Sequence, residues 1–152
     1  MHPETSVHPP SGARFQRSAL AATLTLLMAV VLPIAALIDQ LGTRTLDDYS
    51  NSMYAAHGIS ASPGEIYVLL YVAAGFGIAF WLIALTSVWT RRKWARASVI
   101  AAIVVSALIA GTLFMATEYG QHIFPPIWGV FASLAPIAGI VSLAVSTSNN
   151  RD

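Results

Sequence analysis

Carboxylate and imidazole side chains, which can bind metals or transfer protons, gather in two segments of this sequence, residues 39–65 and 118–122. Neither segment contains a His-x-x-His, His-x-x-x-His or His-x-x-Glu pattern, which would put two ligands on one helical turn. We therefore expect no metal and no cofactor. The weak candidates for metal binding are His57, His122 and Glu118, which meet only if the two segments fold together. The full set is Asp39, Asp47, Asp48, His57, Glu65, Glu118 and His122.

The sequence contains no recognisable motif for nucleophilic catalysis. The chain contains no cysteine, which excludes thiolate nucleophiles, disulfides and thiolate metal sites. A serine hydrolase needs a nucleophile with a base and a positioning group, and no serine outside the apolar segments lies in a recognisable elbow motif. We expect no catalytic residues and prefer a protein without enzymatic activity. A membrane enzyme or metal-binding protein that uses the Asp, Glu and His side chains stays open as an alternative.

These side chains lie next to or between four long apolar segments of the chain. Of the 152 residues, 56% are hydrophobic and 10% are charged, whereas a soluble domain has about 25% charged residues. An apolar run of roughly 18 residues is long enough to cross a bilayer as a helix. The pattern predicts an all-α integral membrane four-helix bundle in residues 18–146, between a disordered cytoplasmic tail, 1–17, and a cytoplasmic tail, 147–152. The predicted spans are 18–38, 66–89, 97–117 and 125–145.

Basic residues concentrate in one short loop, TRRKWARAS, between the second and third predicted spans. With four spans, this loop and both termini lie on one side, which holds seven of the 8 Lys and Arg residues; Arg44 is the exception. Lys and Arg beside spans stay cytoplasmic. We therefore predict a multi-pass protein of the bacterial cytoplasmic membrane with both termini cytoplasmic, and we expect the loop to contact lipid headgroups and no nucleic acid. The loop residues concerned are Arg91, Arg92, Lys93 and Arg96.

Aromatic residues stand near the ends of the predicted spans, where Trp and Tyr favour the membrane interface. Trp89 and Trp94 bracket the basic loop. At the opposite face a matching aromatic belt is predicted from Tyr67, Tyr71, Tyr119 and Trp128.

Small residues recur at four-residue spacing on the predicted spans and let helix backbones approach closely in lipid. The third span has the longest such stripe. We predict that the stripes form helix–helix contacts, either within one chain or between two copies. The predicted packing residues are Ser98, Ala102, Ser106 and Ala110, with Ala73 and Gly77 on the second span and Ala135 and Gly139 on the fourth.

The middle of each span contains no Asp, Glu, Lys, Arg, His, Asn or Gln. Proton relays and ion-coupled carriers place ionisable groups within the bilayer, and membrane haem proteins need axial ligands there. Both functions are therefore disfavoured. The hydroxyls that remain in the spans can bond to their own helix backbone.

The first loop on the far side of the membrane has a helical pattern of its own. In residues 46–57, Leu46, Tyr49 and Met53 follow helical spacing and form one face. Thr45 is the predicted N-cap and Gly58 the predicted stop. We predict a short amphipathic helix in this first extracytoplasmic loop, with the three side chains pointing toward the bilayer or the top of the bundle. A partner-binding role for this helix is a further hypothesis.

The second span is expected to begin with a capping box, in which Ser62 is the N-cap and Glu65 is at the third helical position.

The sequence features as a whole favour a small polytopic membrane protein that is a non-enzymatic subunit or accessory protein. It would act through helix–helix association, as a homo-oligomer or in a larger membrane complex. A small oligomeric pore, holin or passive transporter is the alternative from a second class.

Overall fold

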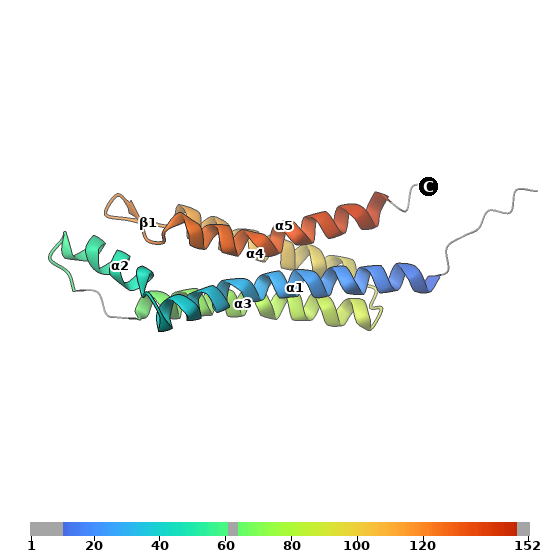
Figure 1. The fold of residues 1–152 in the computed structure, drawn as a ribbon. Helices are drawn as coiled ribbons and strands as arrows, with labels where there is room; N and C mark the ends of the chain where they lie inside the picture. Colours follow the sequence, from blue (N-terminus) through green and yellow to red (C-terminus); the bar gives the residue numbers. More distant parts are fainter. Residues whose placement is uncertain (1–10, 61–63, 149–152) are drawn as a thin grey trace, which may run out of the picture.

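The computed structural model describes residues 11–60 and 64–148 of the chain, and it is almost entirely helical (Figure 1). Four long helices are joined by short connections, and a fifth, shorter helix follows the first. A two-stranded antiparallel hairpin precedes the last helix. The elements are α1 (Ser11–Leu41), α2 (Thr45–Ala55), α3 (Glu65–Trp89), α4 (Ala95–Met115), β1 (Thr117–Glu118), β2 (Gln121–His122) and α5 (Pro126–Ser148).

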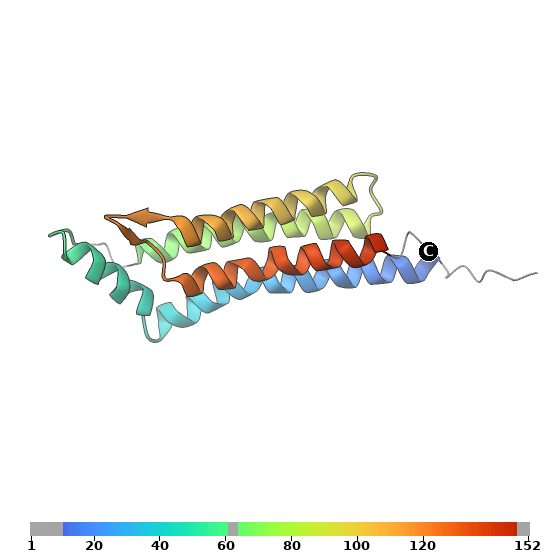
Figure 2. The same cartoon turned by 90° about the horizontal axis from the view of Figure 1, so that it is seen from above.

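The four long helices form a bundle in which α1 packs on α3 and α5, and α4 also packs on α3 and α5 (Figure 2). Each long helix contains a segment that is long and apolar enough to span a membrane: Ser18–Leu41, Glu65–Trp89, Ala95–Met115 and Pro126–Ala144. The predicted all-α membrane bundle with a short helix in the first loop is therefore confirmed. The protein is a multi-pass membrane protein.

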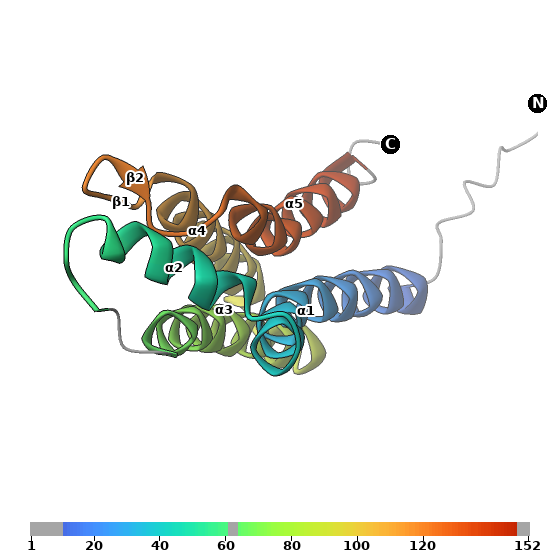
Figure 3. The same cartoon turned by 60° about the vertical axis from the view of Figure 1, so that its left-hand side comes forward.

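The two ends of the bundle differ. At one end, α2 and the β1–β2 hairpin form additional structure, which we call the cap. The α3–α4 connection lies at the opposite end, on the side of the chain termini (Figure 1). Figure 3, in which the first end comes forward, shows α2 lying across the ends of the long helices. We call the two ends the cap end and the basic-loop end.

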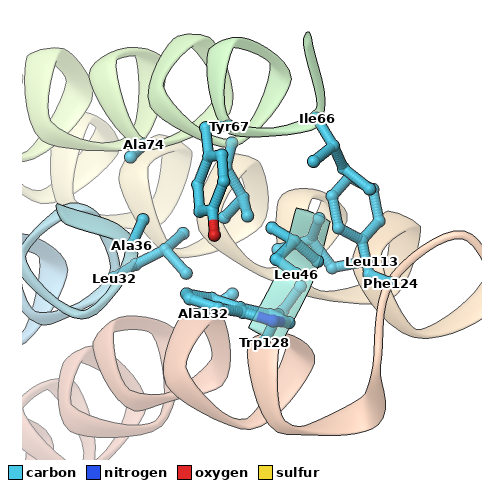
Figure 4. Packing of buried hydrophobic residues seen from close by; sticks show 12 residues of the cluster. Leu32, Ala36, Leu46, Ile66, Tyr67, Ala74, Leu113, Phe124, Trp128 and Ala132 are labelled. Carbon is cyan, nitrogen blue, oxygen red and sulfur yellow. The ribbon is translucent and has the colours of Figure 1, made fainter. Parts of the chain in front are cut away.

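The largest buried cluster lies near the cap end and joins all four long helices to α2 (Figure 4). Leu32 of α1, Leu46 of α2 and Tyr67 of α3 meet there, and Trp128 of α5 closes the cluster. A second cluster surrounds Trp81, nearer the basic-loop end. Because lipid tails are as apolar as these side chains, close packing and hydrogen bonds rather than expulsion of water hold such helices together.

The small residues of α4 face the interior of the chain. Ser98, Ala102, Ser106 and Ala110 are all buried. Gly139 on α5 is also in close contact, because a side-chain Cβ at this position would lie 2.7 Å from a ring carbon of Trp81. These small residues therefore lie between helices of one chain.

The remaining packing candidates, all on α3 and α5, have different surroundings. Gly77 and Ala135 are buried, whereas Ala73 is half-buried. Ala73, Gly77 and Ala135 line a small cavity in the centre of the bundle together with Ser106, and its volume is about 20 Å³. A cavity of this size holds about one water molecule.

Two predicted boundaries need correction. Helix α1 begins at Ser11, so the tail predicted to be disordered up to residue 17 is helical from residue 11; a helix can continue beyond the apolar segment because its backbone bonds are internal. Residues 1–10 lie outside the described part. The second corrected boundary is the end of α4, which lies at Met115 rather than at residue 117, because Ala116 is extended and the hairpin follows. The turn places Tyr119 and Gly120 at φ 52° and 79°, as in the favoured type I′ hairpin turn.

The predicted aromatic belt is wrong for two of its four members. Tyr67 is fully buried, and Trp128 is almost fully buried. Tyr119 is 48% exposed, as Trp89 and Trp94 are also exposed at the opposite end. The cap covers the ends of α3 and α5. The side chains of Tyr67 and Trp128 therefore face protein instead of the lipid interface.

Candidate functional site

The carboxylate of Asp39 organises the cap end. Its Oδ1 accepts hydrogen bonds from the hydroxyl of Thr43 at 2.9 Å and from the backbone N–H of Thr45 at 3.0 Å. Its Oδ2 accepts from the backbone N–H of Leu46 at 3.0 Å and from the hydroxyl of Tyr67 at 2.6 Å. The hydroxyl of Thr45 also donates to Oδ1. One carboxylate therefore joins the end of α1, the start of α2 and the first turn of α3.

This arrangement corrects the predicted start of α2. The helix begins at Thr45, and the residue before it, Arg44, has a left-handed backbone with φ 52° and makes no side-chain cap hydrogen bond. Asp39 satisfies the first free N–H groups of α2 from the preceding helix, where a carboxylate also suits the helix dipole. Thr45 is thus not the N-cap. A capping residue six positions upstream can reach α2 only because the turn after α1 folds back.

Three further side-chain contacts brace α2 against the rest of the cap end. The hydroxyl of Tyr49 donates to the backbone carbonyl of His122 at 2.7 Å. The hydroxyl of Tyr54 donates to Oε2 of Glu118 at 2.6 Å. At the other side, Oδ1 of Asp47 accepts a hydrogen bond of 3.1 Å from the backbone N–H of Gly64. The hairpin and the start of α3 are therefore both tied to α2.

The start of α3 also differs from the prediction. The residue that precedes the helix is Gly64, at φ 90°, and Glu65 is the first helical residue rather than the third. Glu65 therefore does not occupy the third helical position that the predicted capping box requires. Ser62 lies outside the described residues. The left-handed conformation explains the glycine, because other residues rarely adopt it.

A cleft of about 480 Å³ opens between α2, the first turns of α3 and the hairpin. We call it the α2 cleft. Its polar lining consists of Ser50, Tyr54, Ser60, Glu65 and Glu118. Its apolar lining consists of Ile59, Ile66, Leu69 and Ile123.

The α2 cleft has a negative character. Two of its lining residues are carboxylates and none is Lys or Arg. The hydrogen bond to Glu118 raises the pKa of the Tyr54 hydroxyl to about 12, with burial and the negative charges of Glu118 and Glu65 acting in the same direction. Tyr54 therefore stays a neutral donor, and the two glutamates supply the charge of the cleft.

The three weak metal candidates each have other surroundings in the structure. The ring of His57 stacks on that of Tyr119 with centroids 4.3 Å apart, and its Nδ1 lies 3.1 Å from the carbonyl oxygen of Met53. Glu118 is engaged by Tyr54, and His122 is exposed on β2. Within residues 11–60 and 64–148, no group of three or more His, Cys, Asp or Glu side chains is placed to hold a metal ion.

The face of α2 that carries Leu46, Tyr49 and Met53 is the one predicted to point toward the bilayer or the top of the bundle, and it packs toward the bundle. Leu46 is fully buried and Met53 is 2% exposed, while Tyr49 is half-buried. Because their own chain covers Leu46 and Met53, these two side chains are not offered to a partner, and the partner-binding role of the helix stays a hypothesis. The face of α2 that is exposed includes Asp48, Asn51 and Ser52.

The basic residues lie at the opposite end of the molecule. Arg91, Arg92, Lys93 and Arg96 are all exposed in or beside the α3–α4 connection. Just inside this connection, the hydroxyls of Ser87 and Ser98 form a buried hydrogen bond of 2.6 Å. The bond fixes the junction of α3 and α4 and leaves the basic side chains outside the bundle.

The bonds of Asp39 and the α2 cleft were both missed by the sequence analysis. Asp39 was grouped with other acidic residues, and Tyr67 was assigned to an interfacial belt. The position of Asp39 could have indicated a special role, since it is the one acidic residue directly attached to the first predicted span. Its hydrogen-bond partners could not be predicted from the sequence.

Comparison with known proteins gives no matching family model, no matching curated protein and no matching solved structure.

Proposed function

We propose that this protein is a non-enzymatic subunit or accessory protein of the bacterial cytoplasmic membrane. It acts by association, with a second copy of itself or with another membrane protein, and the outward face of α2 is the surface that is recognised. The observation that carries the proposal is the braced cap. Two antiparallel helices can be joined by a few residues, yet residues 42–64 contain a helix whose position is held by specific hydrogen bonds from α1, α3 and the hairpin.

Ordering such a connection costs conformational entropy, so the cap is more than a spacer. A fixed surface is useful where another molecule must recognise its shape, because less entropy is lost on binding. The polar side chains of Asp48, Asn51 and Ser52 are exposed on this surface. We propose that they form the contact.

The distribution of charge supports an orientation with the cap outside the cell. The basic-loop end carries Arg91, Arg92, Lys93 and Arg96, whereas the cap end carries Asp39, Asp47, Asp48, Glu65 and Glu118 with Arg44 as its basic residue. Loops rich in Lys and Arg are retained in the cytoplasm. Both termini then lie in the cytoplasm, and the cap faces the other side.

Association is tested by site-directed cross-linking in native lipid, where the lack of cysteine makes single-cysteine variants clean. Asn51→Cys, on the exposed face of α2, is extracted in polymer-bounded nanodiscs and labelled with a short thiol-reactive photo-crosslinker, which can react with any neighbouring chain. We expect a stoichiometric product heavier than the 16.2 kDa chain. Val104→Cys, on an exposed flank of α4, is the matched control and should give little product. A monomeric mass in the nanodiscs, with no product from Asn51→Cys, would overturn the proposal.

A further inference from the structure

We propose that the α2 cleft binds an organic ammonium group, with the carboxylates of Glu65 and Glu118 as its counter-charges and the apolar wall holding the carbon chain beside it. This inference goes beyond the proposed function, because it assigns a ligand to the inner side of the cap rather than a partner to its outer face. An ammonium of this kind is carried by the headgroup of an aminophospholipid and by free organic amines.

The dimensions and lining of the cleft fit a small ligand. Its volume of about 480 Å³ lies within the roughly 300–1,000 Å³ range of small-molecule sites. Such sites combine an apolar lining with a few placed polar groups. Here Ile59, Ile66 and Ile123 supply part of the apolar lining, and the two glutamates with Tyr54 supply the polar groups.

The charge of the cleft selects a cation. Glu65 and Glu118 line it, and no Lys or Arg is among its lining residues. Glu118 accepts one hydrogen bond, from Tyr54, which leaves further lone pairs on its two oxygens. An ammonium group has several N–H donors that can use them.

An organic cation fits better than a metal ion. A bare divalent cation takes six or more oxygen ligands in the case of Ca²⁺, or a near-ideal octahedron in the case of Mg²⁺. The cleft offers two carboxylates, and no three acidic or histidine side chains of the described chain are grouped for metal binding. Its isoleucine and leucine side chains would also be left unused by a bare ion.

The position of the cleft suits a molecule that is partly embedded in lipid. Glu65 is the first residue of the apolar segment of α3, and Leu69 is one turn further into it. Leu69 is 53% exposed, so one wall of the cleft continues onto the outer surface of α3. A charged group held by the glutamates can therefore keep its hydrocarbon portion against that surface, at the level where a membrane segment meets the headgroup region.

The first experiment uses the full chain, purified in a neutral detergent, and hexylammonium chloride as the probe in isothermal titration calorimetry. Hexanol and sodium chloride at equal concentration are the controls for the apolar and ionic parts of the probe. We expect saturable one-to-one binding of hexylammonium only. Glu65→Gln and Glu118→Gln should each weaken binding about tenfold, the effect of removing one charge-assisted hydrogen bond. Asp48→Asn, on the exposed face of α2, is the matched variant and should bind normally.

The second experiment separates the two sources of the ammonium. Native mass spectrometry follows the adduct formed when phosphatidylethanolamine or phosphatidylglycerol is added to the same protein. An ethanolamine-lipid adduct that Glu65→Gln and Glu118→Gln both lose identifies the lipid headgroup, whereas hexylammonium binding without such an adduct identifies a free amine. Glutamine at position 118 can still accept from Tyr54, and unchanged circular dichroism verifies folding of each variant.

Several outcomes would overturn the inference. They are the absence of saturable hexylammonium binding, equal binding of hexanol, or binding that both glutamine variants retain. Saturable Mg²⁺ or Ca²⁺ binding at the glutamates, without hexylammonium binding, would replace the organic cation by a metal. None of these results depends on Asn51 cross-linking, so the inference and the proposed function can fail separately.

Discussion

The hydroxyl of Tyr67 on α3 donates a hydrogen bond of 2.6 Å to Oδ2 of Asp39 at the end of α1, and both side chains are buried. The same oxygen accepts the N–H of Leu46 on α2 at 3.0 Å. The relationship couples three helices through one atom. It also explains why α2 lies across the bundle rather than extending from it, because the first turn of α2 is bound to a carboxylate fixed between α1 and α3.

Asp39→Ala should destabilise the folded protein by about 2 kcal/mol or more, because it leaves a buried hydroxyl and two backbone N–H groups without their acceptor. Tyr67→Phe should cost less, about 1 kcal/mol, since Asp39 keeps its other donors. The measurement is reversible unfolding in mixed detergent micelles. Asp48→Ala is the matched control, because Asp48 is exposed on α2 and should stay within about 0.5 kcal/mol of the original protein. Equal effects of Asp39→Ala and Asp48→Ala would contradict the coupling.

Gly139→Ala should destabilise the bundle, whereas Gly75→Ala should not. A Cβ at 139 would lie 2.7 Å from Trp81 and 2.8 Å from Ile103, whereas a Cβ at 75 meets nothing within 4 Å. Overpacking of a tight contact costs about 1–3 kcal/mol, while alanine in an open helical position gains up to about 1 kcal/mol over glycine. Thermal unfolding of the two variants in the same detergent compares them. A smaller loss for Gly139→Ala than for Gly75→Ala would show that α5 does not pack as described.

Ser106→Leu should be more damaging than Val104→Leu. Ser106 is buried and its Oγ accepts a hydrogen bond of 2.9 Å from Nε1 of Trp81, whereas Val104 is 51% exposed on the outer face of α4. Leucine at 106 both overfills the interface and removes the acceptor of a buried donor, for a combined cost of about 2–4 kcal/mol. Thermal unfolding of the two variants in the same detergent, followed by circular dichroism, compares them. Indistinguishable unfolding curves would argue against this seam.

Tyr54 should contribute to the free energy of unfolding at neutral pH, and this contribution should be lost at high pH. Its pKa is raised from 10.0 to about 12, chiefly by the hydrogen bond to Glu118. Because the folded state favours the protonated phenol, the contribution is fully present below pH 10 and disappears as the pH rises toward 12. Ultraviolet absorbance of tyrosinate, compared between the original chain and Tyr54→Phe, isolates this residue. Glu118→Leu should lower the pKa of Tyr54; an unchanged titration would disprove the role of the hydrogen bond.

Cysteine labelling on intact cells should place the cap outside and the basic loop inside. Ser52→Cys is the suitable outer probe, because Ser52 is exposed while its neighbour Ser50 is buried. Thr90→Cys, exposed in the α3–α4 connection, is the inner probe. An impermeant thiol reagent should label position 52 in intact cells and position 90 only after the membrane is opened. The reverse pattern would invert the orientation.

The elements that depend on local composition can be predicted from the amino-acid sequence. Uncharged apolar length predicts the four spans, and helical spacing of Leu46, Tyr49 and Met53 predicts α2, because both are properties of consecutive residues. The hydropathy of a membrane helix is similar on its lipid-facing and protein-facing sides. For this reason, sequence alone did not distinguish whether the stripe through Ser106 packs within one chain or between two.

Which distant side chains meet depends on the three-dimensional fold and could not be predicted from the sequence. The Asp39–Tyr67 bond joins residues on two helices, and the Tyr54–Glu118 bond joins residues from α2 and the hairpin. Both require the turn after α1 to fold α2 back over the bundle, where Arg44 adopts φ 52°. Local propensity gives no signal for such a left-handed arginine, which the surrounding contacts must stabilise. The α2 cleft also depends on this position of α2, because its walls come from three elements that only this fold brings together.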